Sequence, residues 1–240
     1  MMEWLLSNKE WFLLIFFSFL PPLIYTIWIR NTEKYHREKW RTILICFLWG
    51  ASIAVIAALI LEILLEIPLA ASIDDYDTLA LMTVVLIAPV AEEFTKPLAL
   101  RLKSVKKEIN EFEDGLIYGA VAGLGFSATE NLFYGWSFLE EGIFIFLILI
   151  SIRSFAGCLL HASATALTGY GYGKAIMKHT SIVRIIPYFV LAIFVHSFYN
   201  FLVTIELIGV ITGLLAALIF VTFSITLVRR KISSLDENSR

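Results

Sequence analysis

Long apolar runs, separated by short charged segments, are the feature of this chain that most restricts its fold. Of its 240 residues, 59% are hydrophobic, whereas a soluble domain is roughly 45–50% apolar. A helix crosses the hydrocarbon core of a bilayer in about 20 residues. By that measure the chain has about seven spans, over 11–29, 42–66, 78–100, 115–136, 143–175, 184–204 and 207–228. We therefore predict an all-α, polytopic transmembrane helical bundle that forms a single integral membrane domain over 1–240 in the cell membrane.

Three segments carry expectations of their own. The run 143–175 is too long for one upright helix, so it must tilt, kink near Gly157 or continue into water. The segment from Lys103 to Asp114 suits a short amphipathic helix at the membrane surface. The polar tail 232–240 is expected to be disordered.

The charges of the connecting segments alternate in sign along the chain. The first, third and fifth connections and the tail are basic, whereas the second, fourth and sixth are acidic. Lys and Arg concentrate in cytoplasmic loops of membrane proteins. The pattern therefore predicts an N-terminus outside the cell and a C-terminus in the cytoplasm. The net charge of -2 gives no indication of nucleic-acid binding.

Charged side chains interrupt the third span. Glu92 and Glu93 are followed by Lys96, one turn beyond Glu92, which is the favourable order for an ion pair on a helix. Pro89 and Pro97 flank this group and are expected to distort the helix. A charge inside the hydrocarbon costs several kcal/mol, so such residues need a partner or a function.

Further polar residues follow on the next three spans. The fourth span carries Glu130, and its glycines at 115, 119 and 123 form a face that lets a neighbouring helix approach closely. Arg153 and His161 lie in the fifth span, and His196 and Asn200 lie one turn apart in the sixth.

Some of these residues have ordinary structural explanations. A single buried histidine such as His161 is typical of a structural hydrogen-bonding residue, and Arg153 suits a counter-ion. Glu62 and Glu66 lie near a span end, where interfacial water would solvate them. The glycines at 169, 171 and 173 suit helix packing. The glutamate pair together with Glu130, His196 and Asn200 is too costly for packing alone, and therefore indicates a functional site.

The charges leave the chemistry of that site open. Three glutamates outnumber Lys96, so either a proton is shared or a cation is bound. A carboxylate can act as a general base on water, and His196 and Asn200 can donate hydrogen bonds to an oxyanion. Peptide-bond hydrolysis, a metal site and a proton pathway all satisfy these constraints.

The order and spacing of these motifs resemble the PrsW family of intramembrane proteases, which belongs with the CAAX prenyl endopeptidases and bacteriocin-processing relatives. The resemblance covers about 85–204, the expected catalytic core, and rests on Glu92-Glu93-x-x-Lys96, Phe126-x-x-x-Glu130, His161 and His196-x-x-x-Asn200. The prenyl endopeptidase branch typically carries an Arg further after the glutamate pair, and a His at the place of Glu130. The chain departs from that branch at both places, which argues against a prenylated substrate.

The resemblance implies an endopeptidase that cleaves a membrane-anchored, single-pass protein, for example an anti-sigma factor. Glu92 or Glu93 would be the general base, tuned by Lys96. Glu130 would help to hold the water and would pass a proton to the leaving amine. His196 and Asn200 would stabilise the oxyanion, and His161 would orient a carboxylate or join the site. The oligomeric state stays open.

Three alternatives remain. One is a metal-dependent protease in which His161, His196, Glu93 and Glu130 bind an ion such as zinc, although the chain has no HExxH motif. The others are a proton- or cation-coupled transporter and a scaffold without catalytic activity. The expected depths conflict, because Glu92 lies in the inner half of its span and Glu130 in the outer half of the next.

Overall fold

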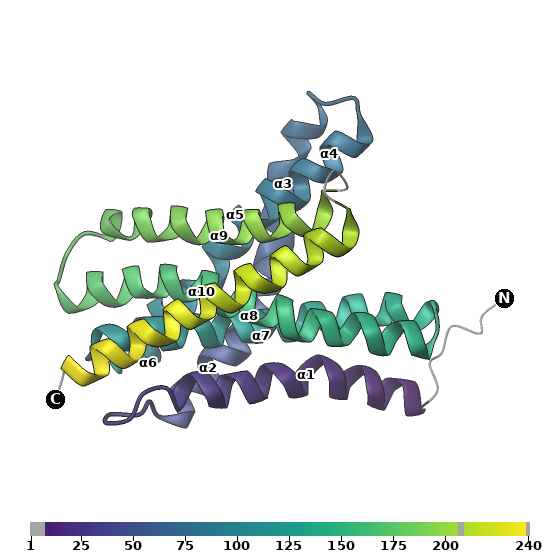
Figure 1. Cartoon of the computed structure of the whole chain (residues 1–240). Helices are drawn as coiled ribbons and strands as arrows, with labels where there is room; N and C mark the ends of the chain where they lie inside the picture. Colours follow the sequence, from purple (N-terminus) through teal and green to yellow (C-terminus); the bar gives the residue numbers. More distant parts are fainter. Residues whose placement is uncertain (1–7, 206–208, 239–240) are drawn as a thin grey trace.

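The computed structural model describes residues 8–205 and 209–238, and every regular element in these ranges is helical. In chain order they are α1 (Asn8–Arg30), α2 (Trp40–Trp49), η1 (Gly50–Ala54), α3 (Val55–Ala70), α4 (Tyr76–Met82), η2 (Thr83–Ile87), α5 (Ala88–Thr95), η3 (Lys96–Arg101), α6 (Lys103–Lys106), α7 (Phe112–Glu140), α8 (Ile143–Met177), η4 (Ile182–Ile185), α9 (Ile186–Thr204) and α10 (Val210–Asn238). Figure 1 shows a bundle of long helices from which the α3–α4 hairpin projects. The predicted all-α polytopic fold is confirmed.

Six helical stretches in the described residues are long and apolar enough to cross a membrane. They correspond to the expected spans other than 115–136. That span lies within α7, a helix of 29 residues whose polar side chains, among them Glu130 and Asn131, make it less apolar. A helix surrounded by protein does not need a lipid-facing surface. Most of the side chains of α7 from Glu113 to Ala128 are indeed buried.

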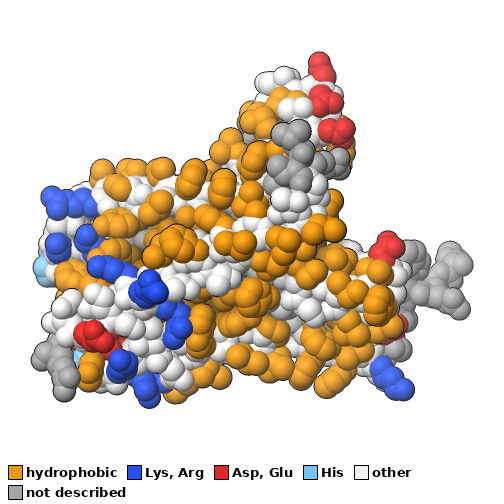
Figure 2. Space-filling view, viewed as in Figure 1, with side chains coloured by type: hydrophobic (Ala, Val, Ile, Leu, Met, Phe, Trp, Pro, Cys, Tyr) orange, Lys and Arg blue, Asp and Glu red, His pale blue; other side chains and the backbone are white. Residues whose placement is uncertain are grey.

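The charged connections separate in space as their alternation predicts. The connection 31–39, α6, the connection 178–181 and the end of α10 lie at one end of the bundle (Figure 1). Lys and Arg side chains gather there, and acidic side chains mark the tip of the α3–α4 hairpin (Figure 2). Apolar side chains cover the sides of the molecule between these regions, as contact with lipid requires. Which end faces the cytoplasm stays a prediction.

Helix α8 is continuous over 35 residues and passes through Gly157. At about 1.5 Å per residue, such a helix is roughly 52 Å long, which exceeds the approximately 30 Å of hydrocarbon. A break at Gly157 is therefore not how the long span is accommodated.

The predicted disorder of the tail is wrong for residues 232–238. Helix α10 continues to Asn238, with Ile232 and Asp236 buried. The carboxylate of Asp236 accepts hydrogen bonds from the backbone N–H groups of Lys34 and Tyr35, at 2.8 and 3.3 Å. A contact across some 200 positions of sequence holds the tail, and no local pattern reveals it.

The amphipathic helix expected over 103–114 forms only its first turn, as α6. Helix α7 then begins at Phe112, after a capping box between Glu111 and Asp114. Such a box satisfies backbone N–H groups that have no partner within the helix. The acidic cap therefore ends the surface segment early and starts the central helix.

The glycines of α7 bring its backbone against that of α8, as the four-residue spacing predicts. A Cβ atom at Gly119 would lie 2.6 Å from the carbonyl oxygen of Thr165. The glycines at 115 and 123 lie equally close to the backbone at Gly169 and His161. This contact sets the separation of α7 and α8 and so the positions of Glu130 and His161.

We expect Gly119→Val to destabilise the protein by about 3 kcal/mol, because the side chain would overlap the α8 backbone and overpacking forces helices apart. Thermal unfolding of the purified protein in detergent measures this loss. Gly157→Ala is the matched control, since a Cβ at Gly157 meets no other atom within 4 Å. Equal melting temperatures for the two variants would contradict the close packing.

Candidate active site

Irregular helix geometry surrounds the glutamate pair, as the flanking prolines predict. Helix α5 follows the π-helical segment η2, and the chain changes to 3₁₀ geometry at Lys96, just before Pro97. π-Helical turns are rare and are frequent at functional sites. This arrangement turns three charged side chains toward α8 and α9 within a short stretch of chain.

The ammonium group of Lys96 lies at the centre of the site. Its Nζ lies 2.7 Å from Glu92 Oε2, 2.9 Å from Glu93 Oε1 and 2.8 Å from His161 Nδ1. It also lies 4.4 Å from the centre of the Phe126 ring, a cation–π contact. Lys96 is fully buried, so these groups take the place of water around its charge.

The two glutamates differ in how fully they are engaged. Glu93 is fully buried, and its Oε1 also contacts His196 Nδ1 at 2.9 Å, while its Oε2 accepts a hydrogen bond from Thr165 at 2.9 Å. Glu92 contacts Lys96 through Oε2, which lies 3.7 Å from His161 Nδ1 and 3.9 Å from His196 Nε2. The Glu92 side chain is 7% exposed. Glu93 is thus fixed on both oxygens, whereas Glu92 keeps some access to its surroundings.

Glu130 reaches the site through His161. Its Oε2 lies 2.6 Å from His161 Nε2 and 3.2 Å from the guanidinium of Arg153. His161 therefore bridges Glu130 on one ring nitrogen and Lys96 on the other. The packing of α7 against α8 resolves the expected conflict in depth, and Arg153 is the counter-ion that the sequence suggested.

Asn200 makes a different contact from the one expected. Its amide donates a hydrogen bond of 2.8 Å to the carbonyl oxygen of Val84. Val84 lies in η2, where π geometry disrupts the regular hydrogen-bonding pattern. The observed contact makes Asn200 a partner of this segment, one turn away from His196.

Sequence reasoning missed two residues of the site. Thr165 lies one turn after His161, and this spacing could have indicated its place beside Glu93. Glu62 on α3 was expected at the interface, yet Glu92 and Glu130 are its strongest charged neighbours. Its position depends on how α3 packs, which no local spacing reveals.

Four side chains of the site have the donor atoms that a metal ion requires. They are Glu92, Glu93, His161 and His196. One ligand atom from each lies within 4.8 Å of the others, and imidazole and carboxylate are common zinc ligands. The set contains Glu92 where the sequence suggested Glu130. Glu130 instead holds the far nitrogen of His161, as carboxylates commonly do behind a ligating histidine. Lys96 Nζ contacts three of the same four side chains.

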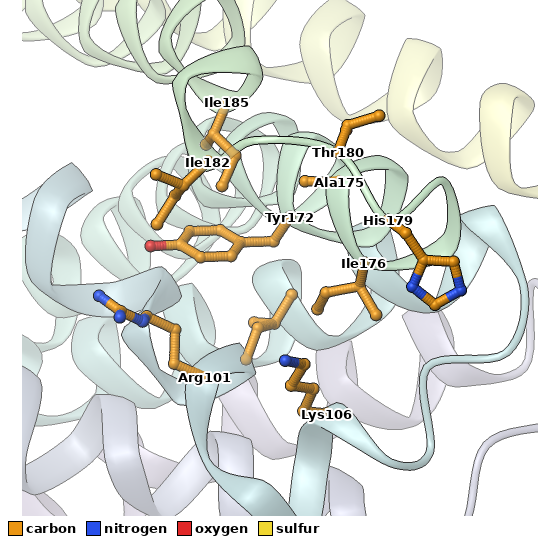
Figure 3. A pocket seen from close by; sticks show the side chains of 10 residues that line it. Arg101, Lys106, Tyr172, Ala175, Ile176, His179, Thr180, Ile182 and Ile185 are labelled. Atoms are coloured by element: carbon orange, nitrogen blue, oxygen red, sulfur yellow. The ribbon is translucent and has the colours of Figure 1, made fainter.

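Two adjoining cavities lie between the site and the basic end of the bundle. The larger, about 500 Å³, lies between η3, the end of α8 and η4 (Figure 3). The smaller, about 300 Å³, is mostly apolar and reaches Glu93. Both are lined by Arg101, Tyr172, Ile182 and Ile185. The larger cavity also has Lys106 and His179 on its wall, and we call it the basic mouth. The smaller, mostly apolar cavity beside Glu93 is the inner cavity.

The fold and the site together define a class, the multi-pass membrane proteins that hold carboxylates, imidazoles and a lysine in contact inside a helical bundle. A family model described as "PrsW family intramembrane metalloprotease" matches residues 38–227. The chain belongs to this family of intramembrane proteases.

One curated relative, "Protease PrsW" of Clostridioides difficile (strain 630), is 33% identical over 125 residues. The match covers 52% of this chain and 51% of the relative, so the chain spans about half the length of that protein. No solved structure matches the chain.

Proposed function

We propose that this chain is an intramembrane endopeptidase that hydrolyses a peptide bond of a membrane-anchored protein with a water molecule activated by Glu92. The convergence of Glu92, Glu93, His161 and His196 around Lys96 carries this proposal. These groups are a general base, a fixed positive charge and two imidazoles within contact of one another. Peptide hydrolysis needs each of these functions.

Glu92 is the better general base of the pair. Glu93 already uses both oxygens on Lys96, His196 and Thr165. Glu92 meets Lys96 through one oxygen, and its side chain is not fully enclosed. A water molecule beside Glu92 would lose a proton to this carboxylate as it attacks the substrate carbonyl.

His196 is positioned to stabilise the resulting oxyanion. Its Nδ1 faces Glu93 and its Nε2 faces the space beside Glu92. We assign two ring protons to His196 in this step, one on Nδ1 toward Glu93 and one on Nε2 toward the oxyanion. The Nε2–H group would then donate to the oxyanion, and the ammonium of Lys96 would add electrostatic stabilisation.

His161 and Glu130 form a second contact pair that positions the site. Their contact of 2.6 Å fixes the His161 ring, whose other nitrogen faces Lys96. A proton taken up by Glu92 must reach the leaving amine. We assign its transfer to Glu92 itself, with His161 holding Lys96 and Glu92 in place.

The family description raises the question of a metal. The ion would be held by Glu92, Glu93, His161 and His196. It would polarise the substrate carbonyl and lower the pKa of a bound water molecule. In the structure the ammonium of Lys96 already compensates these carboxylates. The proposed mechanism therefore assigns the positive charge of the site to Lys96.

The two cavities suggest how a substrate segment reaches Glu93. An extended stretch of polypeptide could enter at the basic mouth and place an apolar side chain in the inner cavity. Such a stretch suits a single-pass protein whose helix ends at the membrane surface. A membrane-anchored anti-sigma factor is one substrate of this kind.

Reconstituted protein tests the proposed function directly. Purified protein in liposomes is incubated with a panel of single-pass membrane proteins, including a membrane-anchored anti-sigma factor, with and without a chelator. We expect cleavage of at least one substrate and no loss with the chelator, because Lys96 supplies the charge. Loss of cleavage with the chelator, restored by zinc, would replace this mechanism with the metal-dependent one. Uptake of cations or protons without cleavage would favour a transporter.

A further inference from the structure

A second group of buried carboxylates lies at the basic end of the bundle. Glu33 and Glu38 belong to the connection between α1 and α2, and Asp114 belongs to the first turn of α7. One carboxylate oxygen from each lies within 4.8 Å of the others. All three residues are buried, with exposures of 0%, 6% and 1%. None of them belongs to the candidate active site.

Two oxygens of this group are buried without a hydrogen-bond partner. Glu33 accepts a hydrogen bond from the Glu38 backbone through Oε2, at 3.1 Å, but its Oε1 has no partner. Asp114 accepts from two backbone N–H groups through Oδ2, at 2.7 and 2.8 Å, while its Oδ1 has no such donor and its carboxyl group lies within hydrogen-bonding reach of that of Glu38. Buried carboxylate oxygens are normally satisfied. A proton shared with Glu38 would satisfy Asp114, but the unpartnered oxygen of the fully buried Glu33 indicates a ligand among the three side chains.

The basic residues nearby do not supply the missing charge. The guanidinium groups of Arg30 and Arg37 donate to backbone carbonyls, at 2.6 and 3.0 Å. Lys39 pairs with Glu108 at 2.7 Å. The two carbonyls belong to Glu38 and Glu33, so these arginines meet the backbone of the cluster, and in the described residues no ion pair joins any of the three cations to its carboxylates.

The charged side chains that act most strongly on the cluster are acidic. The charged groups that act most strongly on Glu33 are Asp114, Asp236 and Glu111, the last of which contacts His36 at 3.0 Å. The Tyr118 hydroxyl donates to Glu38 Oε2. The three carboxylates are buried close to one another, so their negative charges repel. An added positive charge would relieve this repulsion.

We propose that Glu33, Glu38 and Asp114 bind a hard divalent cation, Ca²⁺ or Mg²⁺. The donor set is made of carboxylate oxygens alone, which both ions prefer and which sets this group apart from the histidine-containing active site. With Ca²⁺–oxygen distances of about 2.4 Å, ligands on opposite sides of the ion lie about 4.8 Å apart. The three oxygens therefore lie close enough together to be ligands of one ion.

The cation would join segments that are distant in sequence. It ties the α1–α2 connection to the first turn of α7, and the same connection receives Asp236 from the end of α10 through two backbone hydrogen bonds. Helix α7 carries Glu130 toward His161. The site would therefore stabilise the basic end of the bundle without touching substrate.

Terbium luminescence tests this site without any assay of catalysis. Tb³⁺ binds oxygen ligands much as Ca²⁺ does, and a nearby tyrosine, here Tyr118, sensitises its emission. The full chain is purified in detergent, stripped of metal and titrated with Tb³⁺ at neutral pH. We expect saturable emission that Ca²⁺ or Mg²⁺ reverses, and the two competition curves decide which ion is preferred. Emission that does not saturate would overturn the proposal.

Matched variants locate the bound ion. We expect Glu33→Gln and Asp114→Asn to weaken Tb³⁺ binding by at least about tenfold, because each removes a charged ligand. Glu108→Gln, which changes a carboxylate at the same end of the bundle, should bind normally. So should Glu93→Gln, which alters the active site. Unchanged binding in the first pair, or loss in Glu93→Gln, would refute the assignment.

A measurement on the unaltered protein guards against variants that fail to fold. A cation that binds only the folded state raises the melting temperature with its concentration. We expect Ca²⁺ or Mg²⁺ to raise the melting temperature of the metal-stripped protein. A shared proton in place of the ion would leave it unchanged at neutral pH, and that result would contradict the proposal.

Discussion

Glu92→Gln is expected to lower the rate of peptide-bond cleavage by about 10²-fold or more, since a general base contributes on that scale. The folded protein should persist, because the substituted amide keeps the shape of the side chain and can still accept a hydrogen bond from Lys96. Glu92 is also the less enclosed member of the pair. Cleavage of a reconstituted substrate and thermal unfolding of the same preparation measure the two effects separately.

Glu93→Gln is the informative comparison. It should also abolish cleavage, but with a loss of stability of about 3 kcal/mol, because removing one partner of a buried charge network leaves the others uncompensated. Glu93 holds Lys96, His196 and Thr165 together. If Glu92→Gln cleaves normally and Glu93→Gln is inactive but as stable as the parent, the base is Glu93 and our assignment of the pair is reversed.

The sequence was sufficient for the architecture because lipid constrains it so strongly. Run length predicted the six apolar stretches that face hydrocarbon, and it also placed a helix at 115–136, where α7 is largely surrounded by protein. The four-residue spacing of Gly115, Gly119 and Gly123 predicted close packing, since this spacing keeps the small residues on one face. Both inferences rest on local regularities.

The site was predictable as a set of residues but not as a set of contacts. Placing a charged or polar side chain inside a membrane costs free energy. This cost identified Glu92, Glu93, Glu130 and His196 as candidate site residues. Which of them meet depends on rotations and offsets between helices, which a single sequence does not encode locally. Glu130 therefore proved to face His161 rather than the glutamate pair.

The contacts of Asn200 and Asp236 show the same limit. Asn200 meets Val84, and Asp236 meets the backbone at Lys34 and Tyr35. Each contact joins positions more than 100 residues apart. The spacing of Asn200 from His196 predicted a catalytic role. Spacing along one helix does not show which neighbouring segment a side chain contacts.

The side chain of Lys96 distinguishes the two proposed mechanisms. We expect Lys96→Met to abolish cleavage and to destabilise the protein by about 3–5 kcal/mol, because Glu92 and Glu93 would lose the cation that compensates them in a buried site. Methionine is close to lysine in length and fits among apolar neighbours such as Phe126. Cleavage, melting temperature and metal content of the purified variant are the measurements.

A double variant shows whether charge or packing causes the loss. Glu93→Gln combined with Lys96→Met removes both members of the fully buried pair, so it should recover part of the stability that Lys96→Met loses. No recovery would indicate that Lys96 acts through packing. If Lys96→Met instead gains a stoichiometric zinc ion and cleaves substrate, the lysine occupies the place of a metal ion, and the four donors Glu92, Glu93, His161 and His196 form a metal centre.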